Sequence, residues 1–226
     1  MIEKSIISLI VFLALSFVLG KIWLSIFSAK KYRIFIAPGI IVHEFSHGIA
    51  ALLCGAKIQK IDLFSSQGGS VISTKPKIPV FGDFLLSFSP ILGGIGTVLL
   101  LSWAFRYQSY FPIIDLSQPF WTGLWLFLNH IVLFFQSHWL VWEFWVFAYL
   151  VISIIICLVP SARDFKNAFF AVLAFFVLAW FFPGILNLFF NQYLTRAITL
   201  GISFEILVLA LSLPALLLKK ILAAIF

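Results

Sequence analysis

The sequence is poor in charged residues and in cysteine. Only 10% of its 226 residues are Asp, Glu, Lys or Arg, whereas 63% are hydrophobic and the mean hydropathy is +1.15. A soluble domain needs a more polar surface, so this composition indicates a multi-span membrane protein. Two cysteines are too few for a disulfide framework, and we interpret them as small buried side chains. The net charge of +7 comes from residues scattered over short loops, which argues against a nucleic-acid-binding surface.

Long apolar runs predict how the chain crosses a membrane. Runs of about 20 residues predict an all-α polytopic fold with six transmembrane helices, in a single membrane domain covering residues 1–226. They lie near residues 5–27, 34–54, 84–104, 139–160, 166–189 and 197–218. Six spans place both termini on one side, which then carries nine Lys and Arg residues against six on the other. The positive-inside rule therefore predicts an integral, multi-pass protein of the cell membrane with cytoplasmic termini.

Two further segments lie between the predicted spans. Residues 120–135 are apolar but reach only about 22 to 24 Å, less than the roughly 30 Å hydrocarbon core. We interpret them as an interfacial or re-entrant helix. Residues 57–80 are the most polar part of the chain, and the partial alternation around Gly68-Gly69 predicts a membrane-associated β-hairpin. Its strand edge would suit an extended peptide, and a plain connecting loop is the alternative.

The motif His43-Glu44-Phe45-Ser46-His47 lies within the apolar run of residues 34–54. On a helix, residues four apart share one face, so both imidazoles could reach one metal ion with Glu44 beside them. Shuffling this composition would give the pattern in about one chain in a thousand. A Glu in a membrane helix costs roughly 2.5 to 3.5 kcal/mol on insertion scales and persists mainly in a polar interior or for a function. The motif therefore predicts a hydrolytic Zn²⁺ site, with a satisfied pair of buried histidines and an incidental Glu as the alternative.

The third predicted span is rich in small residues. It contains Ser87-Phe88-Ser89-Pro90 and Gly93-Gly94-Ile95-Gly96, which would let a neighbouring helix approach closely. Pro90 breaks one backbone hydrogen bond of the helix. We expect this face to pack against the helix that carries the two histidines, and an ordinary Gly-rich helix without a part in the chemistry is the alternative.

A catalytic zinc needs a third protein ligand and an open position for water. The remaining candidates are Asp62, Asp83, Asp115, Asp164, Glu143, Glu205, His130 and His138. Asp164 follows the fourth span on the side towards which the helix of His47 descends, so we expect it to complete the site. The alternative is a solvated carboxylate paired with Arg163 or Lys166.

The chain resembles the site-2 protease family of intramembrane zinc metalloproteases. The resemblance rests on the order of four features along the sequence: the His43–His47 motif, the hairpin, the helix with Ser89-Pro90, and the segment from Pro160 to Asp164. The resemblance covers roughly residues 34–170 as a catalytic core. It implies Zn²⁺ held by His43, His47 and Asp164, with Glu44 as the catalytic base. The segment around Asp164 departs from the family's Asn-Pro and Leu-Asp-Gly form, since Val159 precedes Pro160 and Arg163 and Phe165 flank the carboxylate.

These features predict peptide-bond hydrolysis within or at the edge of the bilayer. The expected substrate is a membrane-spanning protein or a hydrophobic peptide, and the expected surroundings are the lipid bilayer rather than nucleic acid. Two alternatives stay open: a membrane zinc protease that processes C-termini and uses Glu143 as third ligand, and a non-catalytic metal-binding membrane protein on the same scaffold.

Overall fold

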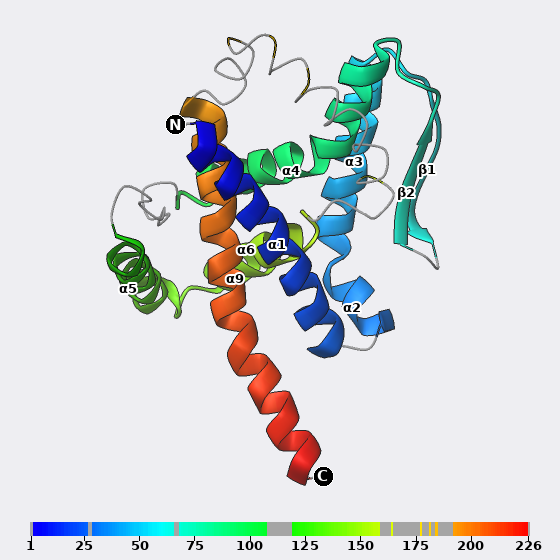
Figure 1. Ribbon diagram of the computed structural model, residues 1–226. Helices are drawn as coiled ribbons and strands as arrows, with labels where there is room; N and C mark the ends of the chain where they lie inside the picture. The colour runs from blue at the N-terminus through cyan, green and yellow to red at the C-terminus, as the bar shows by residue number, and fades with distance from the viewer. Residues whose placement is uncertain are drawn as a thin grey trace.

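The computed structural model describes residues 2–26, 29–65, 68–107, 119–158 and 192–225, together with Asp164, Val177, Phe181 and Gly184. The described chain is mostly helical, with one two-stranded sheet (Figure 1). Its elements are α1 (Ile2–Ile26), α2 (Ala29–Phe35), α3 (Ala37–Leu53), β1 (Ile58–Ser65), β2 (Gly68–Ser73), α4 (Pro79–Ala104), α5 (Phe120–His138), α6 (Trp142–Ile156) and α9 (Gln192–Ile225). Five of the six predicted apolar segments are helical in their described parts. The segment 166–189 lies almost entirely outside the described residues.

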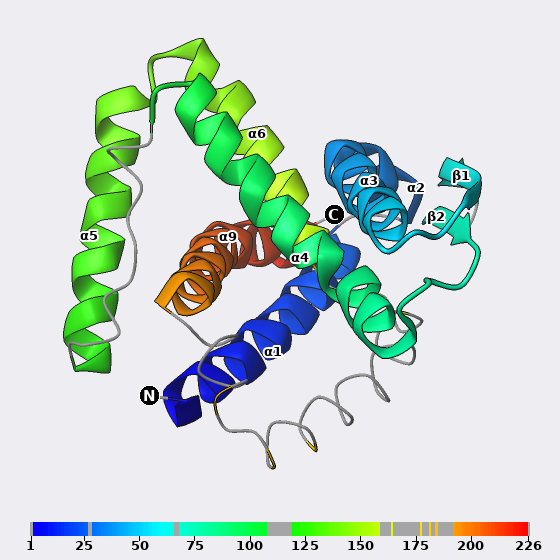
Figure 2. The same cartoon turned by 90° about the horizontal axis from the view of Figure 1, so that it is seen from above.

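Helix α3 is held between α4 and α6. It begins with Pro38 in its first turn, where a missing N–H costs nothing, and the chain leaves it through Gly55, whose φ of +70° favours glycine. The N–H of Gly39 donates to Ser153 Oγ of α6 at 2.9 Å, which satisfies one donor of the first turn. Figure 2 shows α4 and α6 side by side, next to α3.

The small residues of α4 allow α3 to approach closely. A methyl group on Gly93 would overlap the side chain of Ser46, in the middle of the His43–His47 motif. Ser46 itself donates to the Val42 carbonyl at 2.6 Å, so its polar atom is satisfied within α3. The expectation that this face of α4 packs against the motif helix is therefore confirmed.

The predicted β-hairpin is also present. Strands β1 and β2 pair antiparallel, with Ile61 opposite Val71 and Asp62 opposite Ser70. The pair lies along α3, at the outer side of the molecule (Figures 1 and 2). Residues 66 and 67, at its turn, lie outside the described residues.

Helices α1 and α9 run parallel to each other. Gly201, early in α9, lies against the ring of Phe12, and the ammonium of Lys219, late in α9, donates to the carbonyl of Ser25 at the end of α1. The two ends of the chain accordingly lie at opposite ends of the molecule (Figure 1). Six single crossings would make the first and last spans antiparallel, so this packing does not agree with placing both termini on one side.

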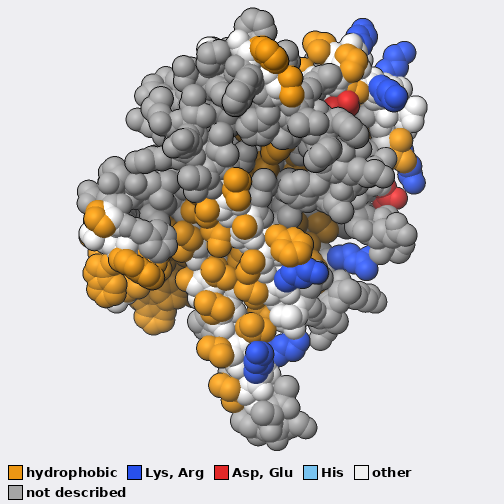
Figure 3. Space-filling view, in the orientation of Figure 1, with side chains coloured by type: hydrophobic (Ala, Val, Ile, Leu, Met, Phe, Trp, Pro, Cys, Tyr) orange, Lys and Arg blue, Asp and Glu red, His pale blue; other side chains and the backbone are white. Residues whose placement is uncertain are grey.

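The surface of the described part is strongly apolar. Phe17 of α1 and Leu217 of α9 are more than half exposed. Figure 3 shows hydrophobic side chains over α1, α9 and α5, with Lys and Arg mainly towards the hairpin and the C-terminal parts of α1 and α9. Among the described residues, Phe81–Ala104 of α4 is the one stretch long and apolar enough to cross a membrane by itself. The number of spans and the interfacial position of α5 stay predictions.

Candidate metal centre

Helix α3 places His43 and His47 on one face, with Glu44 next to His43 along the chain. His43 and His47 are separated by one helical turn, and their side chains are each 13% exposed. Glu44 is buried, with 6% of its surface exposed. The helical spacing thus brings two imidazoles and a carboxylate to one partly enclosed position, as the motif predicts.

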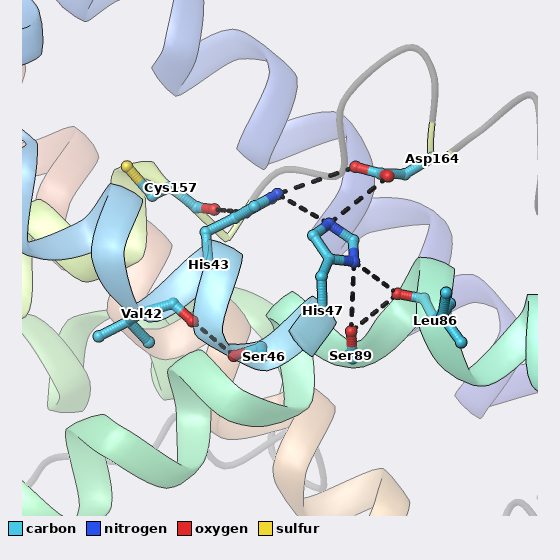
Figure 4. A network of polar contacts seen from close by, with 8 residues as sticks. All are labelled: Val42, His43, Ser46, His47, Leu86, Ser89, Cys157 and Asp164. Atoms are coloured by element: carbon cyan, nitrogen blue, oxygen red, sulfur yellow. Dashed lines mark hydrogen bonds and ion pairs between the residues drawn. The ribbon is translucent and has the colours of Figure 1, made fainter. Parts of the chain in front are cut away.

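The ring of His43 is held by the end of α6. Its Nδ1 lies 2.7 Å from the carbonyl oxygen of Cys157, the residue that follows the helix (Figure 4). A carbonyl oxygen can only accept, so Nδ1 carries the proton, and in the neutral ring Nε2 keeps its lone pair. The last carbonyls of a helix have no partner within that helix, which makes this one available to His43.

The ring of His47 is held by α4 in the same way. Its Nδ1 donates to the carbonyl of Leu86 at 2.9 Å, and the hydroxyl of Ser89 donates to the same oxygen at 2.7 Å. Both histidines therefore have the same tautomer and direct Nε2 away from their backbone partners. Orientation of this kind, in which Nδ1–H is held by a carbonyl, is usual for histidines that bind a metal through Nε2.

Asp164 completes a group of three acceptors (Figure 4). Its carboxylate oxygens lie 3.8 Å from His43 Nε2 and 3.5 Å from His47 Nε2, and the two Nε2 atoms are 3.2 Å apart. Three acceptors at such distances repel one another unless a cation or a proton lies among them. Ligands of a tetrahedral zinc are about 3.3 to 3.5 Å apart, so the two histidines and the aspartate fit this ion.

The side chain of Glu44 lies against the β-hairpin. A Cβ atom on Gly69 of β2 would lie 2.5 Å from Glu44 Cγ, 2.6 Å from Oε1 and 2.8 Å from Cδ. The backbone of β2 thus covers the carboxyl group, and only a residue without a side chain permits this approach. The sequence identified Gly69 as part of a turn but gave no sign of this contact.

The other candidate ligands are not brought to the centre. In the described part of the chain, His43, His47 and Asp164 are the one group of three possible ligands whose atoms lie within 4.8 Å of one another. Glu143 lies in the first turn of α6, about 21 Å along the helix from Cys157. His43, by contrast, contacts the residue that follows the last turn of this helix. Asp115 lies outside the described residues.

The two backbone carbonyls that hold the histidines had little signal in the sequence. The sequence predicts that a helix ends near Cys157 and that its last carbonyls lack partners within the helix. It does not predict that this end lies beside α3, so the contact with His43 could not be foreseen. The carbonyl of Leu86 could be recognised as unpaired from the sequence, because the residue four positions later is Pro90, which has no N–H to donate to it.

A comparison with known protein families matches the N-terminal part of the chain. Residues 6–109 match the family model described as Peptidase M50B-like. The matched region, which is less than half of the chain, is similar to this family and agrees with the resemblance to site-2 proteases. No significant match to a curated protein or to a solved structure was found.

Site-2 proteases are membrane metalloproteases that generally depend on zinc. The matched region contains the motif helix α3, the hairpin and α4, and it ends before Asp164. The proximity of Asp164 to the two histidines is therefore an independent observation, which comes from the tertiary structure.

Proposed function

We propose that this chain is an intramembrane zinc metalloprotease. The observation that carries the proposal is the convergence of His43 Nε2, His47 Nε2 and the Asp164 carboxylate, with both Nδ1 protons held by backbone carbonyls. This arrangement favours metal binding over a structural role, since two neutral imidazoles that direct their lone pairs at a carboxylate repel it unless a cation lies among them.

Each residue has a distinct part in the proposed reaction. His43, His47 and Asp164 would hold Zn²⁺, which when bound polarises the scissile carbonyl and lowers the pKa of an attacking water. Glu44 is the general base: its carboxylate takes the proton of the water and returns it to the leaving amine. The Cys157 and Leu86 carbonyls keep both imidazoles in the tautomer that leaves Nε2 available.

The proposed substrate is a membrane-spanning protein or a hydrophobic peptide at the membrane. A helix hydrogen-bonds its own carbonyls, so a substrate helix must unwind before its peptide bond reaches Glu44. The contact between Gly69 and Glu44 supports binding of the substrate as an extended segment, because β2 offers a strand beside the general base.

The rival protease type, which would use Glu143 as third ligand, has no support in this arrangement. Glu143 lies in the first turn of α6, whereas His43 contacts the residue after its last turn, and Asp164 lies within 4 Å of both histidines. We therefore put forward one function.

Metal content tests the proposal. Mass spectrometry on detergent-purified protein should find about one zinc per chain in wild type and in Glu143→Ala, and little in Asp164→Ala. Zinc in Asp164→Ala would remove that residue from the ligand set. A wild-type protein without zinc would instead favour a non-catalytic membrane protein and overturn the proposed function.

A further inference from the structure

The carbonyl of Leu86, which holds His47, has no hydrogen-bond donor within α4. In an α-helix the carbonyl of residue i accepts from the N–H of residue i+4, which for Leu86 is residue 90. That residue is Pro90, which lies inside α4 and has no N–H. The carbonyl of Leu86 is therefore released from the helix at the point where α4 passes His47.

Two side chains take the place of the missing donor. His47 Nδ1 lies 2.9 Å from Leu86 O, and Ser89 Oγ lies 2.7 Å from it. A carbonyl oxygen has two lone pairs, so these two donors fill its capacity. The proline ring is almost fully buried, and Ser89 is 6% exposed, so water does not compete freely for this oxygen.

We propose that Pro90 is a positioning residue for the metal centre, because its missing N–H reserves the Leu86 carbonyl for the imidazole of His47. This inference rests on the proposed zinc site. A third donor at position 90 would compete for two lone pairs, and the His47 ring would lose the bond that fixes its tautomer and its direction. Pro90 thus acts on the metal through His47 without touching the metal.

The two histidines are held by carbonyls that are available for different reasons. The Cys157 carbonyl is available to His43 because α6 ends there, whereas the Leu86 carbonyl lies seven residues inside α4 and would be occupied in an uninterrupted helix. A mid-helix carbonyl can serve as the partner of His47 only if the donor four residues later is removed. Proline is the one residue type that removes it.

The decisive variant is Pro90→Ala, which restores the N–H in a residue that favours helices. We expect its zinc dissociation constant, measured by competition with a chelator, to rise about 10- to 100-fold, the usual effect of losing a partner of a metal-binding histidine. Thermal unfolding of the zinc-free protein should not become easier, since α4 gains a hydrogen bond. Gly96→Ala is the matched control, because a Cβ there meets nothing within 4 Å and it also adds an alanine to α4.

A second variant separates this role from a purely structural one. In Ser89→Ala/Pro90→Ala only two donors compete for the Leu86 oxygen, so zinc binding should recover part of the loss seen in Pro90→Ala. A bend imposed by proline would not be restored by removing a hydroxyl. Recovery therefore supports the positioning role, and the absence of recovery overturns it.

The outcomes distinguish this inference from the function on which it rests. Wild type that binds zinc, with an unchanged dissociation constant in Pro90→Ala, overturns the role of Pro90 and leaves the protease proposal intact. A fall in zinc-free stability parallel to the loss of zinc also overturns it, because Pro90 would then support the fold. Wild type that binds no zinc overturns both.

Discussion

Gly69 of β2 lies directly against the carboxyl group of Glu44, so closely that a methyl group at this position would meet the Glu44 side chain at 2.5 to 2.8 Å. The hairpin and the motif helix are thereby joined at the proposed general base. Strand β2 fixes where the carboxyl group can lie, and a change in β2 should alter catalysis without touching the metal ligands.

Substitution of Gly69 by alanine tests this relationship. The added methyl group must displace either the Glu44 carboxyl group or the strand, and a displacement near 1 Å can reduce catalysis about 100-fold. We expect a fall in kcat of that order with zinc content at the wild-type level, measured on a hydrophobic peptide substrate. Gly96→Ala, which meets open space, should hydrolyse the peptide at the wild-type rate. Loss of zinc in Gly69→Ala would show that the strand supports the metal centre instead.

Removal of the carboxylate itself should separate catalysis from metal binding. Glu44→Gln keeps the size of the side chain but cannot accept a proton, and loss of a general base reduces the rate about 100- to 10,000-fold. Zinc content should remain at the wild-type level, because His43, His47 and Asp164 are unchanged. Glu143→Gln, at the far end of α6, is the control and should retain activity. Full activity in Glu44→Gln would exclude its role as the base.

The parallel packing of α1 and α9 predicts that their C-terminal ends lie on the same side of the membrane, and that the chain ends lie on opposite sides. Labelling with a membrane-impermeant maleimide can test this in a Cys54→Ala/Cys157→Ala background. Lys4→Cys and Lys220→Cys should then be labelled from opposite sides. Labelling of both from one side would restore the six-span topology.

Close packing between α3 and α4 predicts a difference between two glycines of one helix. Gly93→Ala would force a methyl group into Ser46 and should destabilise the protein by about 1 to 3 kcal/mol, the usual cost of overpacking. Gly96→Ala has open space and should be neutral or stabilising, because alanine favours the helix. Thermal unfolding of both variants in the same detergent measures the difference. Equal melting temperatures would show that α3 and α4 can move apart at little cost.

Charge counting shows why the topology could not be read from the sequence. The positive-inside rule needs the number of crossings, which the lengths of apolar runs do not fix by themselves. With α9 parallel to α1, Arg196 changes sides with Lys219 and Lys220, and nine basic residues against six become eight against seven. A difference of one basic residue between the two sides does not determine the orientation of the protein in the membrane.

The sequence by itself determined what depends on neighbours along the chain. Helical periodicity placed His43 and His47 on one face, alternation and the Gly68-Gly69 pair specified the hairpin, and apolar runs specified the helices. Only the tertiary structure decided what depends on distant segments: the approach of Asp164 to the two histidines, the contact of Gly69 with Glu44, and the direction of α9 beside α1. The physical reason is that local propensities act over a few residues, whereas these contacts arise from how complete helices pack, which no short stretch of sequence encodes.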